Sequence, residues 1–406
     1  MLTKNRSIMG LVLGGILLTF LFGKGIVQSI ENNLWSVQFA RHLMAHAGPL
    51  AAAPIQHPWA VIWLARDALE RQDPQLAEEL VAPLAAAGNK DALVVLADAL
   101  SSQGEFSEAV VYWEKVGEFK LLIKAADLAR NDGRLEDALL AYRAAYQIDQ
   151  EAGTIPLTSF LWSFCNNQDE AEKVLRDALD SYSHSGQRSS WLLVLGRYLR
   201  QQSIWDESEK YLLDLVREVP HNWQAFIELG WVYYQRGDDL EVAMSAFKRV
   251  NIIDPTRGEG FLAMGQVYAR EKQYQKADEY FVRAIELNPQ VWNWWITRAN
   301  ALRESGNLSS ALVIYQQALE LFPDRAPIYY EMAWAYRLME SKSEAIQAIE
   351  QALALSASPF EWYYIRAGQI FEWAGEPDKA IAAYRAAIQI NPGNANAQAA
   401  LKRLAP

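Results

Sequence analysis

An alanine returns at a nearly constant interval along the second half of this chain. Ala243, Ala277, Ala311 and Ala345 are each separated by 34 residues, and Ala380 follows 35 residues later. Recurrence at a period of about 20 to 50 residues indicates one supersecondary unit that is stacked many times. The period therefore argues against the two or three separate globular domains that a length of 406 residues would otherwise suggest.

Prolines follow the same interval. Pro220, Pro255, Pro289 and Pro323 are separated by 35, 34 and 34 residues. A proline disfavours continuation of the helix before it, because it lacks the backbone N–H and restricts the preceding residue. We therefore expect each of these prolines to follow the last helix of a unit. About ten units fit between residues 58 and 392.

The unit at residues 258–289 shows how each repeat is expected to fold. Its first half has one apolar face at three- and four-residue steps, made by Phe261, Met264, Gly265 and Tyr268. After a polar turn, a second helical face is made by Ala277, Phe281 and Ala284. Gly265 and Ala277 are small, which predicts that two antiparallel helices cross there. A leucine at position 265 is expected to cost about 1–3 kcal/mol through overpacking.

These units resemble the tetratricopeptide repeat, in which an aromatic residue, a Leu-Gly pair, Tyr, Ala, an aromatic residue, Ala and Pro stand at these intervals. One unit carries the pattern in Phe226, Leu229, Gly230, Tyr233, Ala243, Phe247 and Pro255. The resemblance is good in residues 189–394 and weaker in residues 58–188. It implies an all-α, right-handed superhelical solenoid of about ten helical hairpins, with residues 395–406 as a C-terminal capping segment.

Residues 152–188 match the repeat least well. The stretch 159–165 is apolar but lacks a small residue at which two helices could cross. An irregular helical pair is the expectation for this region.

The N-terminus has the pattern of a membrane segment. Residues 1–7 are short and basic, and residues 8–23 contain no charge. An uncleaved signal anchor and a cleavable signal peptide are the two alternatives, but no small-x-small cleavage site follows closely. We predict a single transmembrane anchor at residues 8–27, followed by a juxtamembrane helix and Pro/Ala linker at residues 28–57. The basic start favours a cytoplasmic N-terminus, which places the repeats on the extracytoplasmic side.

Composition and motifs limit the possible chemistry. The net charge of −11 argues against a broad nucleic-acid-binding face, since such a face must be basic. Cys165 is the only cysteine, so no intramolecular disulfide can form, and His42 and His46 alone are too few ligands for a metal. No phosphate loop, nucleophile elbow or zinc-protease motif is present. We therefore expect a protein that is not an enzyme and has no cofactor or metal.

The first helices of stacked hairpins line a concave surface, and binding is expected there. An arginine recurs about once per unit, at positions 200, 270, 303 and 337, as a basic ladder in an acidic chain. Aromatic and amide side chains are interleaved with these arginines. The predicted groove-binding residues are Trp231, Tyr234, Arg270, Asn293, Asn300, Arg303, Tyr330, Trp334, Arg337, Trp362, Gln369 and Trp373.

Two classes of ligand suit this lining. The resemblance implies a protein or peptide partner, so the first hypothesis is a membrane-anchored adaptor or scaffold. The alternative is a glycan, bound by Trp and Arg, in a system that assembles or exports polysaccharides in the bacterial envelope. The lysines of the family's carboxylate-binding arrays are absent from this lining.

Overall fold

The structure is a computed structural model that describes residues 58–237, 239–356 and 360–404. Within these ranges it contains 21 α-helices and no strand. They form ten consecutive pairs and one last helix, as the repeat period predicts. The chain divides between Trp191 and Leu192 into two compact units, each a solenoid of stacked pairs.

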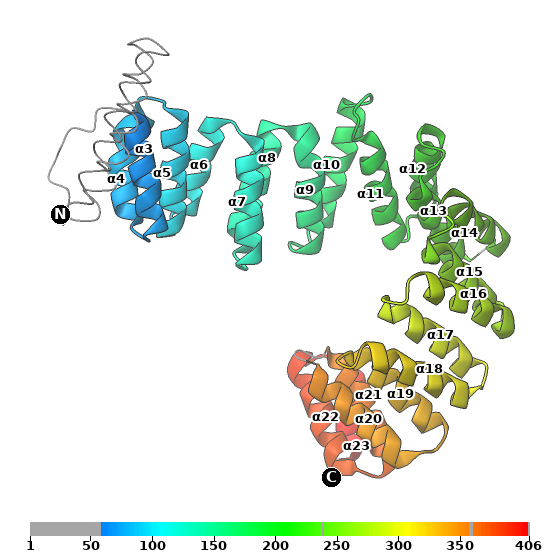
Figure 1. Cartoon of the computed structure of the whole chain (residues 1–406). Coiled ribbons are helices and arrows are strands. Elements are labelled where there is room, and N and C mark those ends of the chain that lie inside the picture. Colours follow the sequence, from blue (N-terminus) through cyan, green and yellow to red (C-terminus); the bar gives the residue numbers. More distant parts are fainter. Residues whose placement is uncertain (1–57, 238, 357–359, 405–406) are drawn as a thin grey trace, which may run out of the picture. The chain divides into compact units, whose positions relative to one another are not determined.

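The N-terminal unit consists of four helix pairs. Figure 1 shows its helices as a row of short rods in which each rod lies beside the next. The helices are α3 (Pro58–Glu70), α4 (Pro74–Ala86), α5 (Lys90–Gln103), α6 (Phe106–Val116), α7 (Phe119–Asn131), α8 (Leu135–Ile148), α9 (Gln150–Ser163) and α10 (Gln168–Ser181). The division between the two units falls inside α11 (Arg188–Gln201).

The C-terminal unit continues the same arrangement. Each first helix packs against its own second helix, and several first helices also contact the next first helix, as α17 contacts α19 and α19 contacts α21. The helices are α12 (Trp205–Glu218), α13 (Trp223–Arg236), α14 (Leu240–Ile253), α15 (Gly258–Arg270), α16 (Tyr274–Leu287), α17 (Trp292–Glu304), α18 (Leu308–Leu321), α19 (Ala326–Leu338), α20 (Lys342–Leu355), α21 (Glu361–Ala374), α22 (Pro377–Ile390) and α23 (Ala395–Leu404).

The turn between α17 and α18 shows why these short helices end where they do. Gly306 has a φ of +85°, which a glycine adopts without the steric cost that a side chain would add. The next residue, Asn307, caps α18, because its side chain accepts a hydrogen bond from the backbone N–H of Ser310 at 3.3 Å. A glycine followed by a polar cap thus reverses the chain in the three residues between α17 and α18.

A glycine of the first helix packs against an aromatic ring of the second. A Cβ atom placed on Gly265 would lie 2.6 Å from Cε1 of Phe281, and one on Gly230 would lie 2.3 Å from Cε1 of Phe247. The expected crossing point is therefore present. The residue of the second helix that lies closest to Gly265 is the aromatic Phe281. The sequence pattern had indicated the small residue Ala277 instead.

Residues 152–188 differ from the expected irregular pair. Both α9 and α10 are regular helices of 14 residues. The small residue at the helix contact is Gly153, which precedes the apolar stretch 159–165, and its hypothetical Cβ atom would lie 2.7 Å from the Cα atom of Tyr146 on α8. Pro156 lies inside α9, as Pro83 lies inside α4.

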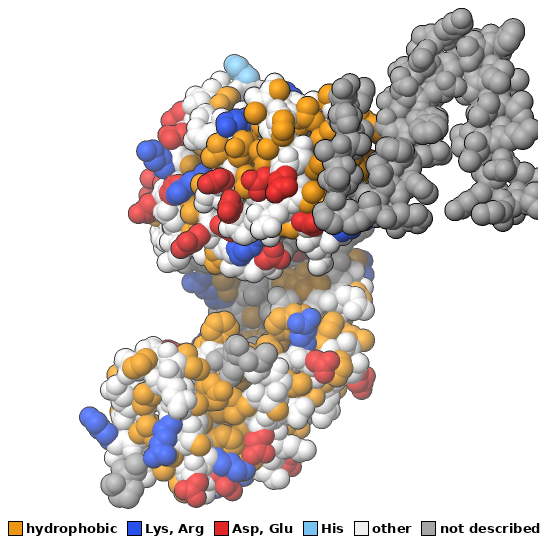
Figure 2. All heavy atoms as spheres, turned by 90° about the vertical axis from the view of Figure 1, so that its left-hand side faces the viewer, with side chains coloured by type: hydrophobic (Ala, Val, Ile, Leu, Met, Phe, Trp, Pro, Cys, Tyr) orange, Lys and Arg blue, Asp and Glu red, His pale blue; other side chains and the backbone are white. Residues whose placement is uncertain are grey.

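The expected membrane segments lie outside the described residues. These are the anchor at residues 8–27 and the juxtamembrane helix and linker at residues 28–57. None of the helices that the structure describes has both the length and the apolar character needed to cross a bilayer. Figure 2 shows one face of the molecule, on which acidic, basic and apolar side chains are interspersed.

Candidate functional site

A pocket of about 780 Å³ lies at the end of the C-terminal unit. We call it the C-terminal pocket. It is formed by the first helices of two successive pairs, α19 and α21, together with α22 and the last helix, α23. Its principal polar and aromatic side chains are Trp334 and Arg337 from α19, Gln369, Glu372 and Trp373 from α21, and Arg403 from α23.

The charges in this pocket do not balance. Arg403 pairs with Glu372, with its Nη2 atom 2.6 Å from the carboxylate. Among the described residues, no carboxylate lies within 4.0 Å of the Arg337 guanidinium. Two guanidiniums against one carboxylate leave a formal charge of +1 in the lining. The pocket therefore favours an anionic group near Arg337.

Arg337 is held by an aromatic ring instead of by an acid. Its guanidinium carbon lies 4.5 Å from the centroid of the Trp334 ring, and that of Arg366 lies 5.2 Å from the same centroid. Both distances are within the range of a cation–π interaction. Trp334 therefore positions two cations, and Arg337 still has its hydrogen-bond donors available for a ligand.

Tyr384 anchors the acidic side of the pocket. Its hydroxyl donates to Glu372 at 3.2 Å. Burial and the neighbouring Glu372 carboxylate raise the pKa of Tyr384 to about 12, so this hydroxyl stays a donor at neutral pH. The Glu372 carboxylate thus accepts a hydrogen bond from Tyr384 and forms an ion pair with Arg403.

The predicted groove residues of the first helices α13 and α15 make contacts inside the protein, within one pair and between successive pairs. Trp231 packs edge-on against Phe247, with ring centroids 5.0 Å apart, and also against Tyr234. The Arg270 guanidinium carbon lies 4.9 Å from the centroid of the Tyr234 ring, and the guanidinium donates to the Tyr234 carbonyl. These three predicted residues therefore stabilise the stack of pairs.

Other parts of the predicted lining are also engaged internally. Asn300 accepts hydrogen bonds from Tyr315 and Arg303, and Arg303 reaches Glu331 of the next first helix at 3.4 Å. Burial raises the pKa of Glu331, and the nearby cations of Arg303 and Arg366 oppose that shift. Arg303 therefore already has an acidic partner, which Arg337 lacks among the described residues.

Tyr330 differs from its predicted role most clearly. Its side chain is only 2% exposed, because the rings of Trp362 and Tyr363 pack edge-on against it. Trp362 covers this core while remaining partly exposed itself, and Asn293 is an exposed residue of α17. Of the twelve predicted residues, the C-terminal pocket brings together four, which are Trp334, Arg337, Gln369 and Trp373.

The sequence pattern missed the residues that balance or complete the pocket. Glu372 lies on the first helix of the last repeat, and Arg403 belongs to the segment expected only to cap the solenoid. The sequence could have indicated Arg403, because α23 has Lys402 and Arg403 in its last turn. The spacing of Lys402 and Arg403 does not indicate which helix their side chains face.

Metal and thiol chemistry have little basis in the described part of the chain. Within residues 58–237, 239–356 and 360–404, no group of three or more His, Cys, Asp or Glu side chains could hold a metal ion. Cys165 is half-buried, and burial raises the pKa of its thiol, which disfavours the reactive thiolate.

Comparison with known families agrees with this architecture. Models of the tetratricopeptide repeat match residues 64–120, 193–257, 258–291, 302–367 and 362–394. The chain is a tetratricopeptide repeat protein. Proteins of this family generally mediate protein–protein interactions and scaffolding. The matches include residues 64–120, where the resemblance in the sequence is weak.

Individual relatives are distant. A DnaJ homolog subfamily C member 7 homolog from Schizosaccharomyces pombe is 23% identical over 53% of this chain and 41% of its own length. The type IV pilus assembly protein PilF from Pseudomonas aeruginosa is 27% identical over 32% of this chain and 53% of its own length. A tetratricopeptide repeat protein from Parabacteroides merdae, solved by crystallography, is 19% identical with a TM-score of 0.48, over 63% of this chain and 99% of that chain.

Proposed function

We propose that this tetratricopeptide repeat protein is an adaptor that binds an acidic segment of a partner protein in its C-terminal pocket. The observation that carries the proposal is Arg337, which is stacked on Trp334 and has no carboxylate partner among the described residues. A ligand carboxylate would complete a charge-assisted, bidentate hydrogen-bonded pair with it. Trp373 adds apolar contact area beside this position, and the exposed Gln369 amide can bind a peptide backbone.

A binding assay with two matched peptide pools tests this proposal. We expect a fluorescent pool rich in Asp and Glu to bind the full chain, and a pool with Asn and Gln in their place to bind more weakly. Because a hydrogen bond to a charged group contributes about 1.5–3 kcal/mol, Arg337→Ala should lower the affinity for the acidic pool by about tenfold or more. Fluorescence polarisation at two salt concentrations measures both effects.

The matched control is Arg283→Ala on α16. This arginine lies in the same unit, but it is exposed and already pairs with Glu286 at 3.1 Å. Its removal should leave peptide binding unchanged. Equal affinity for the acidic and amide pools, or an equal loss in both variants, would contradict the proposed role of Arg337.

A glycan remains the second candidate ligand. It is favoured by Trp334 and Trp373, whose rings could stack on a sugar, and by the amides of Gln369 and Asn396 in the same lining. A neutral oligosaccharide panel in the same assay separates the two candidates. Binding of a neutral sugar that is unaffected by Arg337→Ala would favour the glycan and an envelope polysaccharide system.

We also propose that residues 8–27 anchor the chain in a membrane with the repeats on the extracytoplasmic side. The support is the uncharged stretch at residues 8–23 after a basic start. In bacterial cells whose outer membrane has been removed and whose inner membrane is intact, added protease should degrade the repeats. A cytoplasmic marker protein should survive in the same sample. Repeats that are protected until the inner membrane is lysed would show the opposite topology.

A further inference from the structure

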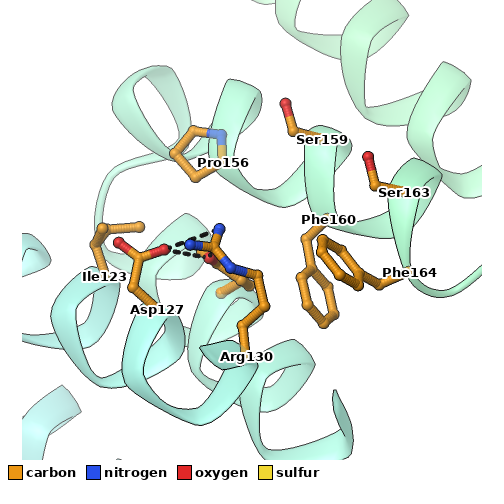
Figure 3. Close-up of a pocket in the computed structure, with 9 residues that line it drawn as sticks. Ile123, Asp127, Arg130, Pro156, Ser159, Phe160, Ser163 and Phe164 are labelled. Atoms are coloured by element: carbon orange, nitrogen blue, oxygen red, sulfur yellow. Dashed lines mark hydrogen bonds and ion pairs between the residues drawn. The ribbon is translucent and has the colours of Figure 1, made fainter. Parts of the chain in front are cut away.

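A second cavity, of about 290 Å³, lies in the N-terminal unit between the first helices α7 and α9. Figure 3 shows its two walls. Asp127 and Arg130 come from α7, whereas Phe160 and Phe164 come from α9. Tyr142 of α8 joins the two walls. None of these residues was predicted to bind a ligand.

The sequence of α9 explains why a cavity remains. Gly153 allows the start of α9 to approach α8 closely, as its contact with Tyr146 shows. Three residues later the Pro156 ring forms part of the cavity wall. Apolar residues lie on every side of α9, so α8 cannot cover them all. As a result, Phe164 at the end of α9 is 49% exposed.

The α9 wall is a stack of aromatic rings that runs from the core to the surface. The Tyr142 and Phe160 centroids are 4.9 Å apart, and Phe160 and Phe164 are stacked at 5.2 Å with an interplanar angle of 20°. Tyr142 and Phe160 are buried, so Phe164 is the accessible end of the stack. An aromatic ring placed in the cavity would continue this arrangement with favourable geometry.

The opposite wall is polar, but its charges cancel. The Asp127 carboxylate accepts a hydrogen bond from the Tyr142 hydroxyl at 2.6 Å and pairs with Arg130 at 3.1 Å. Arg130 in turn donates to the Tyr142 hydroxyl at 3.1 Å. The Asp127 carboxylate would repel a ligand carboxylate, and the Arg130 guanidinium would repel a ligand ammonium. An uncharged group avoids both repulsions.

The size and the rim of the cavity narrow the class of ligand. Its volume is at the bottom of the range for small-molecule sites, about 300–1,000 Å³, so it suits a single large side chain. Ser159 and Ser163 are exposed, one helical turn apart, on the α9 side of the cavity. Their hydroxyls can hydrogen-bond the backbone of an extended peptide.

We propose that the cavity between α7 and α9 is a second peptide-docking site, which takes one uncharged aromatic side chain, Phe or Tyr, from an extended partner segment. This site goes beyond the function proposed for the C-terminal pocket. It lies in the other unit, and it selects for an aromatic ring, whereas the C-terminal pocket selects for a carboxylate.

Binding of defined peptides to the full chain in detergent micelles tests the proposal. The probe is a blocked peptide with Phe at the centre of a Gly/Ser frame, and the comparison peptides carry Leu, Asp or Lys at that position. We expect the Phe peptide to bind at least about tenfold more tightly than the Asp and Lys peptides, and more tightly than the Leu peptide. A photoreactive phenylalanine analogue at the same position should cross-link to α9.

Two variants locate the binding. Phe164→Ser should lower the affinity for the Phe peptide by about tenfold, because it removes the accessible ring of the stack. Leu128→Ser is the matched control, since Leu128 is a similarly exposed apolar residue of α7 that does not line the cavity. If Phe164→Ser fails to fold, Ser163→Trp on the exposed rim should block the cavity and give the same loss.

Arg337→Ala separates this proposal from the previous one. The Phe peptide should bind this variant with unchanged affinity, whatever happens to the acidic peptides. The docking site would be overturned if Arg337→Ala abolished binding of the Phe peptide. It would also be overturned if Ser163→Trp left the affinity unchanged, or if all four peptides bound equally.

Discussion

Replacing Glu228 with Ala is expected to lower the free energy of unfolding by about 3–5 kcal/mol. Glu228 lies on α13 and is only 6% exposed. It accepts hydrogen bonds from Arg197 at 2.6 Å and from Arg200 at 2.9 Å, both on α11. The Arg200 side chain is itself 13% exposed. Without Glu228, this cation stays buried with only the Gln235 amide as a partner. Urea unfolding followed by circular dichroism measures the loss.

Glu286→Ala provides the control for the Glu228 prediction. Glu286 is also a helical glutamate of the C-terminal unit, but it and its partner Arg283 are more than half exposed. Such a surface pair contributes about 0–1 kcal/mol. Replacing Glu228 and Arg200 together with leucine should recover part of the loss, because no buried charge would then remain. Equal losses for Glu228→Ala and Glu286→Ala would refute the argument from burial.

Replacing Gly265 with Leu should lower the free energy of unfolding by about 1–3 kcal/mol. Even the first added atom, Cβ, would lie 2.6 Å and 2.7 Å from two carbons of the Phe281 ring. Phe281 is fully buried, so its ring cannot move away without separating α15 from α16. The midpoint of thermal or urea unfolding should therefore fall.

Gly186→Leu is the matched control, because a Cβ at Gly186 has no neighbour within 4 Å and the residue is exposed. This substitution should change the unfolding midpoint little. Shortening the opposing ring, as in Gly265→Ala with Phe281→Leu, should restore some of the stability that Gly265→Ala alone removes. An unchanged midpoint for Gly265→Leu would show that the two helices do not meet at this glycine.

The recurring alanines, prolines and glycines predicted most of the fold. Such residues act locally: Gly306 and Asn307 terminate and cap helices within one turn, and Gly265 marks a contact inside one hairpin. Residues 150–181 were harder to predict because their close contact, between Gly153 and Tyr146, joins α9 to the preceding pair. The spacing of small residues within one helix pair therefore does not indicate this contact.

The candidate site was only partly predictable. Helical spacing placed Tyr330 and Trp334 on the same first helix, but Tyr330 is buried whereas Trp334 lines the C-terminal pocket. Similarly, the expected basic ladder contained both Arg303 and Arg337. Only Arg303 meets an acid of the next helix, at 3.4 Å, so the two arginines differ in the charge that they offer a ligand.

By itself, the sequence determined that the described chain is a series of helical hairpins, because the period, the helix caps and the small crossing residues all act over one repeat or less. The tertiary structure decided which polar side chains remain available for a ligand. Arg200 and Glu228 are 28 residues apart in the sequence and lie on different helices. Whether such a pair forms depends on how each helix is rotated against the next. The same rotation leaves Arg337 without an acid and leaves Phe164 at the open end of an aromatic stack.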